Sequence, residues 1–203
     1  MRTRPRSPRP IRVYTLPELD ALEAELGDSY GPFAPLTAAT GLRPLEAALL
    51  ERRDINRAGR VLTVLGMKTR GSHRQVPLSG RAQAALDRLS ARIDTPLLFS
   101  APGGGPLNPD NFRRREWGPA VTASGVAKPA RIYDLRSTFA SNALAAGITV
   151  FELAKVMGTS VRMIEKHYGA LLDGAHAGLV GRLDAIEAEP SGQAEHRAEG
   201  EGR

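Results

Sequence analysis

Four residues of this chain have side chains and surroundings suited to chemistry. Arg43 follows Gly41 and directly precedes a proline that can begin a helix, within TGLRPLEAALLERRDI. Arg136 lies at the start of an apolar helical pattern, within RIYDLRSTFASNALAAG. Lys68 lies in the polar turn of GMKTRGSHRQVPL, and Tyr168 lies within MIEKHYGALLDGA. The set combines three cations with a phenol.

The placement of the two arginines indicates an anion-binding site. The backbone N–H groups in the first turn of a helix point outward, and a guanidinium beside them adds a positive charge. An anion is therefore a suitable ligand for Arg43 and for Arg136. The alternative is that both are capping or surface residues, and their spacing alone leaves the two possibilities open.

Helical patterns cover most of the chain from Thr15 onward. Thr15 and Glu18 have capping-box spacing, leucines follow at helical intervals, and Gly27 predicts the end of this helix. Ser79 predicts the start of a later helix. The expected helices are 16–26, 33–40, 79–93, 109–123, 134–146, 150–157, 160–168 and 170–186, with a further one that starts at Pro44.

Two strand-like runs, 60–66 (RVLTVLG) and 73–78 (HRQVPL), are separated by a polar turn and predict a hairpin. Lys68 would lie in this turn. Pro77 has no backbone N–H to donate, which predicts that its strand lies at an edge or an end of the sheet. The expected fold class is therefore mainly α with a small antiparallel β-sheet, an α+β fold.

The composition argues against several classes of protein. A length of 203 residues corresponds to one domain, or to one domain with tails. Hydrophobic residues make up 41% of the chain, which excludes wholesale disorder, and no apolar run reaches the length of about 18 residues typical of a transmembrane helix. The chain has no cysteine, which excludes disulfides and thiolate metal sites and favours a cytosolic location.

Charge is distributed unevenly along the chain. The 28 Lys and Arg residues exceed the 22 Asp and Glu residues, giving a net charge of +6, and five arginines fall within the first twelve residues. We therefore expect a basic arm or linker without order over 1–12, a folded domain over 13–186 and an acidic, disordered tail over 187–203. The net charge allows a nucleic-acid partner but does not require one.

The order of these motifs resembles the catalytic domain of the tyrosine recombinases, the phage integrase family. TGLRPLE, with DI after it, resembles the first arginine box, and LGMKTRGSHRQVPL resembles the lysine-bearing β-hairpin. YDLRSTFASNALAAGITVFELAKVMGTSVRMIEKHYG resembles the second box through the nucleophilic tyrosine. Each motif is weak alone, but four motifs in the right order make a strong signal. The resemblance runs from Tyr14 to Ala185 and marks 13–186 as the catalytic domain.

The resemblance implies site-specific DNA recombination, integration or excision, by transesterification. Tyr168 would attack the scissile phosphate and form a 3′-phosphotyrosyl link, and Lys68 would protonate the leaving 5′-oxygen. Arg43 and Arg136 would bind the non-bridging oxygens and stabilise the pentavalent phosphorane. No nucleotide cofactor or metal is implied, because the phosphotyrosine stores the energy of the bond. The implied partners are double-stranded DNA and other copies of the chain in a tetramer, at a cytoplasmic, nucleoid-associated location.

Two positions depart from the family pattern. Tyr133 stands three residues before Arg136, where the family usually has histidine, and Thr159 follows Gly158, where histidine or tryptophan is usual. A neutral phenol is a poor base at pH 7, and a threonine hydroxyl donates one hydrogen bond without carrying a charge. We expect a working but altered site in which Tyr133 and Thr159 act weakly. The alternative is a catalytically inactive remnant that binds DNA.

The segment before the catalytic domain also differs from that of full-length members. Those proteins carry an N-terminal helical core-binding domain that closes a clamp around DNA, whereas only twelve basic residues stand in its place here. We therefore expect a truncated integrase. With fewer phosphate contacts, its binding to DNA should be weak and sensitive to salt.

Overall fold

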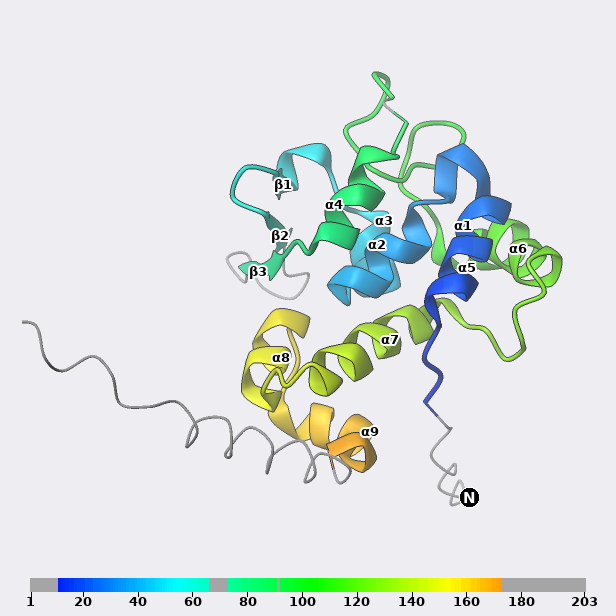
Figure 1. Ribbon diagram of the computed structural model, residues 1–203. Coiled ribbons are helices and arrows are strands. Elements are labelled where there is room, and N and C mark those ends of the chain that lie inside the picture. Colours follow the sequence, from blue (N-terminus) through cyan, green and yellow to red (C-terminus); the bar gives the residue numbers. More distant parts are fainter. Residues whose placement is uncertain (1–10, 66–72, 91, 173–203) are drawn as a thin grey trace, which may run out of the picture.

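The chain is mostly helical and has one small antiparallel sheet, so the predicted fold class is confirmed (Figure 1). The computed structural model describes residues 11–65, 73–90 and 92–172. The helices in these ranges are α1 (Leu16–Tyr30), α2 (Phe33–Thr40), α3 (Pro44–Ala48), α4 (Gly80–Asp87), α5 (Pro109–Phe112), α6 (Gly118–Ala123), α7 (Ile132–Ala145), α8 (Val150–Met157) and α9 (Val161–Leu172), with a 3₁₀ turn at Arg52–Asp54 and a π-helical turn at Arg113–Trp117. None of these described helices is long and apolar enough to cross a membrane.

The sheet has the strand order β1-β2-β3. Its strands are β1 (Ile55–Asn56), β2 (Val61–Leu65) and β3 (His73–Pro77). Leu62 of β2 lies opposite Val76 of β3 in antiparallel register, so the predicted hairpin is confirmed, and Pro77 lies on an edge strand as expected. The sequence did not predict β1, because two residues are too few to show alternation. Lys68, predicted to lie in the hairpin turn, falls outside the described residues.

Polar caps begin helices where the sequence predicts them. The Thr15 hydroxyl accepts a hydrogen bond from the backbone N–H of Glu18 at 3.3 Å, and the Glu18 carboxylate accepts one from the backbone N–H of Thr15 at 2.9 Å. Ser79 begins α4 in the same way, because its hydroxyl accepts from the N–H of Ala82 at 3.3 Å. Each of these bonds satisfies a backbone donor that has no partner within its helix.

Of two predicted helix ends, one coincides with a break in a helix and the other is wrong. Gly27 adopts φ 66° and ψ −172°, which interrupts the helix as predicted, but the chain then returns to helical geometry and α1 continues to Tyr30. The helix that starts after Ser79 ends at Asp87 and not near Ile93. There the guanidinium of Arg57 donates to the carbonyl oxygen of Leu86 at 2.9 Å, which satisfies one terminal carbonyl of α4 by a contact distant in sequence.

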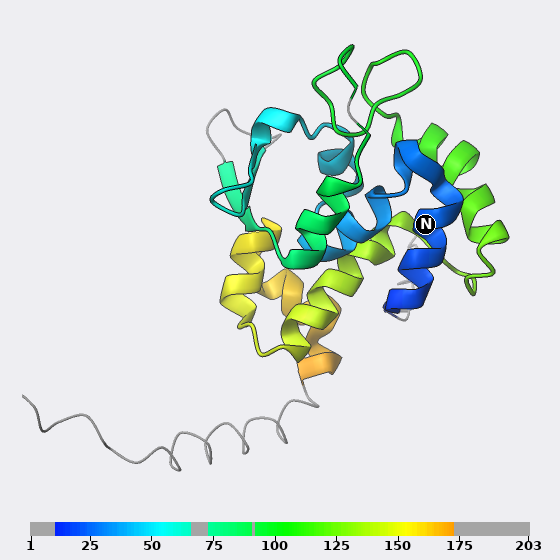
Figure 2. The same cartoon turned by 45° about the horizontal axis from the view of Figure 1, so that its top comes forward.

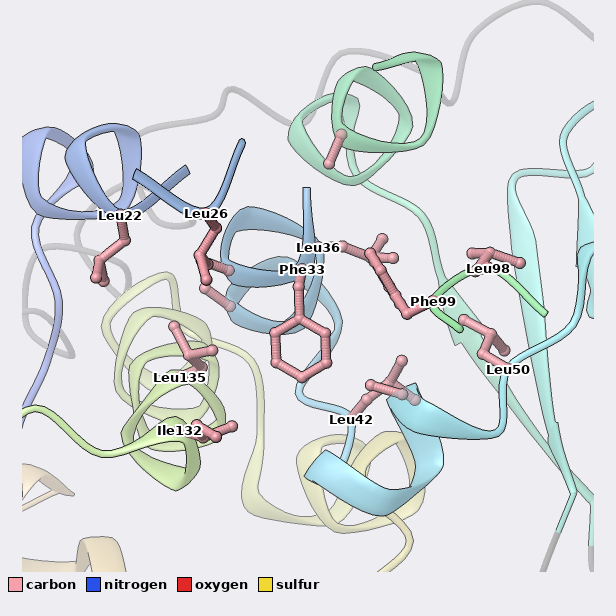
Figure 3. Packing of buried hydrophobic residues seen from close by; sticks show 14 of the residues in the cluster. Leu22, Leu26, Phe33, Leu36, Leu42, Leu50, Leu98, Phe99, Ile132 and Leu135 are labelled. Carbon is pink, nitrogen blue, oxygen red and sulfur yellow. The ribbon is translucent and has the colours of Figure 1, made fainter. Parts of the chain in front are cut away.

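Helix α2 lies at the centre of the main hydrophobic core and packs against α1, α4 and α7. Phe33 of α2 is 1% exposed, and its ring makes a T-shaped contact with the ring of Phe99 at 5.2 Å between centroids. Figure 3 shows that leucines of α1 and α7 lie around the Phe33 ring. Burial of each such side chain stabilises the fold by about 1.5–3 kcal/mol. This packing holds the segment after α2, which carries Arg43, close to α7, which carries Arg136.

A second and smaller cluster forms where α7, α8 and α9 meet. Its buried members are Ala140, Ala143, Leu153, Ala154, Met157, Ile164 and Tyr168. Figure 1 and Figure 2 both show α8 and α9 beside α7. The packing of this cluster therefore holds the candidate nucleophile Tyr168 against the helix that carries Arg136.

The last two residues of the predicted arm pack on the domain. Ile11 is half-buried against the second cluster. Arg12 pairs with Glu18 at 2.6 Å, and its guanidinium carbon lies 4.8 Å from the centroid of the Tyr14 ring. The rest of the arm predicted over 1–12, and all of the tail predicted over 187–203, lie outside the described residues.

A Gly41→Ala protein is expected to be less stable than the wild-type chain by about 2–3 kcal/mol. Gly41 ends α2 with φ 65°, in the left-handed region that strains any residue with a Cβ. A Cβ at this position would also overlap the ring of Phe139. Urea unfolding measures the loss. Gly80→Ala is the control, because a Cβ at Gly80 would contact nothing, and an equal loss in both proteins would contradict this explanation.

Candidate active site

Three arginines from different parts of the chain meet at the C-terminal end of α8. The carbonyl oxygens of three successive residues at this end each accept a hydrogen bond from a different guanidinium. The pairs are Arg74 with Val156, Arg136 with Met157 and Arg43 with Gly158, each at 2.8 Å. The last carbonyls of a helix have no partner within it and carry partial negative charge, so they attract cations. This helix end brings together the two arginines that the sequence analysis selected.

Arg136 is the most buried of the three arginines, with 2% of its surface exposed. Besides the carbonyl of Met157, its guanidinium donates to the carbonyl of Gly41, the residue that ends α2. Burial, with a smaller contribution from the like charge of Arg43, holds the pKa of Arg136 below its usual range. A buried cation beside a second cation is stabilised by an anion, so the electrostatics of the pair favour a negatively charged ligand.

Arg43 is the more accessible of the two, with 40% of its side chain exposed. One Nη donates to Glu46 Oε1 at 2.8 Å, and the other donates to the carbonyl of Gly158 at 2.8 Å. The backbone N–H of Arg43 also donates to Glu46 Oε2 at 2.8 Å, which begins α3. The guanidinium is therefore held from two sides while part of it faces solvent, where a phosphate could reach it.

Glu46 is the carboxylate shared within this site. Its side chain is 8% exposed, and Arg74 forms a two-pronged pair with it, Nη1 to Oε1 at 2.9 Å and Nη2 to Oε2 at 2.7 Å. Burial raises the pKa of the Glu46 carboxyl, but hydrogen bonds from Arg74 and Arg43 outweigh this and leave the pKa below its usual range. Glu46 is therefore ionised at neutral pH and holds both arginines.

Tyr168 lies on α9 and is 6% exposed. Its hydroxyl donates to the Ser137 hydroxyl at 3.4 Å, and Ser137 directly follows Arg136 on α7. The phenol oxygen thus lies beside the turn of α7 that carries the buried arginine. Arg43, Arg136 and Tyr168 are brought into one region by α8, which contacts both α7 and α9.

The remaining predicted residues lie around this centre or outside the described chain. Tyr133 is three residues before Arg136 on α7, which places it on the same face of that helix, and it is 53% exposed. Thr159 directly follows the end of α8, and its backbone N–H donates to the carbonyl of Ala154 at 3.0 Å. Lys68 is outside the described residues, so its position relative to Tyr168 stays a prediction.

Glu46 and Arg74 belong to the site but were not predicted from the sequence. Glu46 stands three residues after Arg43 in front of a proline-started helix, which is capping-box spacing, and this signal could have found it. Arg74 lies two residues before the buried Val76 on β3, so the strand pattern places both side chains on the inner face of the sheet. A charged residue at an inward position indicates a buried ionic partner. Among the described residues, no group of three or more metal-ligating side chains is present.

The Tyr168 phenol is expected to ionise only above about pH 10 in the DNA-free protein. Burial raises its pKa, and the hydrogen bond to Ser137 offsets this in part. The phenolate absorbance of the wild-type chain minus that of Tyr168→Phe, followed as pH rises, measures this ionisation, and a difference that titrates below pH 10 would contradict it. Since the folded pKa is the higher one, the stability that this group contributes is present below about pH 10 and is lost as pH rises through the folded value.

Comparisons with known proteins identify the family and the fold of the chain. A family model described as the phage integrase family matches residues 29–174. XerA recombinase has a TM-score of 0.65 and 20% identity, with 89% of this chain and 67% of that chain covered. The Tn1549 transposon integrase, in complex with circular intermediate DNA, has a TM-score of 0.68 and 19% identity, with 80% and 64% covered. The catalytic core of lambda integrase has a TM-score of 0.56 and 19% identity, with 72% and 90% covered. No curated protein matches the sequence.

The family model covers most of the chain, and its matched range contains Arg43, Arg136 and Tyr168. The solved structures are less than 25% identical to the chain and support its fold. The chain spans about two thirds of the length of the XerA and Tn1549 structures. The resemblance seen in the sequence motifs is therefore confirmed, and this chain belongs to the phage integrase family.

Proposed function

We propose that this chain catalyses site-specific DNA recombination by breaking and rejoining DNA strands at a phosphodiester held by Arg43 and Arg136. The observation that supports this most is that both guanidiniums bind carbonyls at the end of α8. The Tyr168 hydroxyl contacts Ser137, the residue that follows Arg136 on α7. Two arginines offer paired donors to the non-bridging oxygens of one phosphate. Arg136 is buried whereas Arg43 is partly exposed, so the phosphate would approach from the side of Arg43.

In the proposed reaction, the Tyr168 oxygen attacks phosphorus as the bond from phosphorus to the 5′-oxygen breaks. The tyrosine loses its proton, the 5′-oxygen gains one, and the strand remains joined to the protein through a 3′-phosphotyrosyl bond. Rejoining reverses these steps with the 5′-hydroxyl of the same or another strand. No redox change or external energy source is involved, because one phosphodiester replaces another.

The phenol needs assistance in this step. A phenol with a pKa of about 10 is ionised to about one part in 10³ at pH 7, which corresponds to about 4 kcal/mol, and burial of Tyr168 adds to this requirement. The positive charges of Arg136 and Arg43 favour both the phenolate and the negative phosphorane. Within this proposal Lys68 protonates the leaving 5′-oxygen, and Tyr133 and Thr159 donate or accept weak hydrogen bonds in place of histidines.

We infer the partners of this chain from solved structures of other integrases. The Tn1549 integrase is solved with circular intermediate DNA, and lambda integrase is solved as a tetramer bound to a Holliday junction. For this chain we propose double-stranded DNA with a specific site as substrate, and self-association of copies of the chain on that DNA. Its place of action would then be the cytoplasm, at the nucleoid.

Covalent capture on duplexes of randomised sequence tests the proposed function. The chain is incubated with duplexes whose central sequence is randomised and which carry a nick close to each possible cleavage position, so that the released fragment diffuses away and the adduct is trapped. The expected result is an SDS-resistant protein–DNA adduct whose DNA converges on one sequence and whose phosphopeptide contains Tyr168. Retention of duplexes without any adduct would instead support the catalytically inactive, DNA-binding alternative.

A further inference from the structure

Arg74 is the most constrained cation of the site, and the proposed reaction does not use it. Its side chain is 14% exposed and comes from β3, the second strand of the hairpin. It makes three hydrogen bonds, one from Nε to the carbonyl of Val156 and two to the Glu46 carboxylate. We propose that Arg74 is a positioning residue that aims the Arg43 guanidinium at the scissile phosphate by fixing the orientation of Glu46. This inference rests on the proposed function of the site.

The hydrogen bonds at Glu46 show how the orientation is fixed. Each carboxylate oxygen accepts one bond from Arg74 and one from Arg43. Oε1 accepts from Arg74 Nη1 at 2.9 Å and from Arg43 Nη1 at 2.8 Å. Oε2 accepts from Arg74 Nη2 at 2.7 Å and from the backbone N–H of Arg43 at 2.8 Å. Arg74 thus occupies one side of both oxygens and leaves a single direction for the Arg43 side chain.

Without Arg74, the carboxylate would be free to rotate and to form a two-pronged pair with Arg43 itself. Such pairs are the preferred geometry of arginine with a carboxylate. The second Nη of Arg43, which now donates to the Gly158 carbonyl at 2.8 Å, would then turn toward Glu46 and away from α8. The donors needed by a phosphate would be taken up by the carboxylate.

Charge supports the same conclusion. Three cations face Glu46 from different elements: Arg74 from β3, Arg43 from the start of α3 and Arg136 from α7. Arg74 compensates the Glu46 charge at short range, so the charges of Arg43 and Arg136 remain available for an anion. Loss of Arg74 would leave Glu46 compensated by Arg43, the residue that has to bind the phosphate.

The end of α8 is shaped around the Arg74 side chain. Gly158 ends α8 with φ 62°, and a Cβ there would lie 2.9 Å from Arg74 Cδ and 3.0 Å from Nη1. The absence of a Cβ at Gly158 therefore leaves room for the Arg74 side chain close to the helix end, where it contacts Glu46 and the Val156 carbonyl. Arg74 links the hairpin strand, the start of α3 and the end of α8 in one network.

A double-mutant cycle on the captured duplex tests this role. Arg74→Ala is expected to slow adduct formation at saturating duplex by about 10- to 100-fold, while the affinity for the duplex changes by only a few fold. In an Arg43→Ala background the same change is expected to alter the rate by no more than about twofold, because its effect passes through Arg43. Arg74→Lys is expected to behave like Arg74→Ala, because lysine cannot form the two-pronged pair.

The matched control is Arg88→Ala. Arg88 forms the same kind of two-pronged pair with Glu23, at 2.6 and 3.0 Å, between α4 and α1 and apart from the site. This change is expected to leave the rate unaltered. Equal slowing by Arg74→Ala with and without Arg43 would overturn the proposal, as would full activity of Arg74→Lys, since either result would make Arg74 an independent cation.

A second measurement separates this inference from the proposed function. In the DNA-free chain, nitrogen NMR of the guanidinium groups reports how fast the Arg43 Nη groups rotate, with Arg43→Lys used to assign the signals. Arg74→Ala is expected to change the Arg43 rotation rate, and Arg74→Gln gives a second variant if alanine reduces folding. An unchanged rate would overturn the positioning role even if the wild-type chain forms adducts. A changed rate in a chain that forms no adduct would support the positioning role and reject the proposed function.

Discussion

A Tyr168→Phe protein is expected to form no SDS-resistant adduct with any duplex that the wild-type chain cleaves. Only the phenol oxygen can form the proposed bond to phosphorus, and phenylalanine lacks it. The fold should be unaffected, because the ring packs in the cluster between α7 and α9 and its hydroxyl makes one long hydrogen bond, to Ser137 at 3.4 Å. Gel electrophoresis of the denatured mixture measures the adduct, and gel shift under native conditions measures the retained binding.

Tyr133→Phe is the matched control for this result. It removes a second phenol oxygen from the same region, but one on a side chain that is 53% exposed and three residues before Arg136. Adduct formation is expected to persist in this protein at a reduced rate. If Tyr168→Phe still gave the adduct, or if Tyr133→Phe alone abolished it, then Tyr168 would not be the nucleophile.

Arg136→Ala is expected to slow adduct formation by about 10²–10³-fold, the range found when a single donor to a transition-state oxyanion is removed. Arg136 is the buried member of the arginine pair, and it bridges the carbonyls of Gly41 and Met157. The change removes a charge from the proposed phosphate site and also leaves both carbonyls without this donor. Single-turnover kinetics on the captured duplex measure the rate, and urea unfolding measures the accompanying change in stability.

Arg136→Lys distinguishes the two contributions. A lysine retains the positive charge but cannot bridge two carbonyls and a phosphate in one plane. We expect its rate to lie between those of Arg136→Ala and the wild-type chain. A wild-type rate in Arg136→Ala would show that the phosphate is held elsewhere and would remove the basis of the proposed mechanism.

Local signals in the sequence predicted much of the fold. The capping residues Thr15 and Ser79 begin helices in the structure, and the runs on either side of the hairpin turn pair as predicted. These features depend on residues within a few positions of one another, which is why the sequence alone contains them. The return to helical geometry after Gly27 and the early end of α4 were not predicted, because they depend on the residues that follow or on contacts with distant residues.

For the site, the sequence predicted the residues proposed to act on the phosphate but not the residues that hold them in place. Arg43, Arg136 and Tyr168 were selected from motifs, and the structure brings them together around α8. Local patterns mark Glu46 as a capping residue and Arg74 as an inward-facing residue of its strand, but they do not show that the two side chains pair across β3 and α3. That α8 would serve as the common acceptor of three arginines likewise depends on packing between elements far apart in sequence.

The three carbonyls at the end of α8 also bear on how tightly a phosphate can be held. Long guanidinium side chains lose about 1.5–2 kcal/mol of rotamer entropy each when they are immobilised. Here that loss is incurred when the protein folds, since the carbonyls already hold Arg43 and Arg136. A phosphodiester therefore meets aligned donors at little further entropic cost, which is the advantage of a preorganised oxyanion site. Binding of a phosphodiester would then require little rearrangement of Arg43 and Arg136.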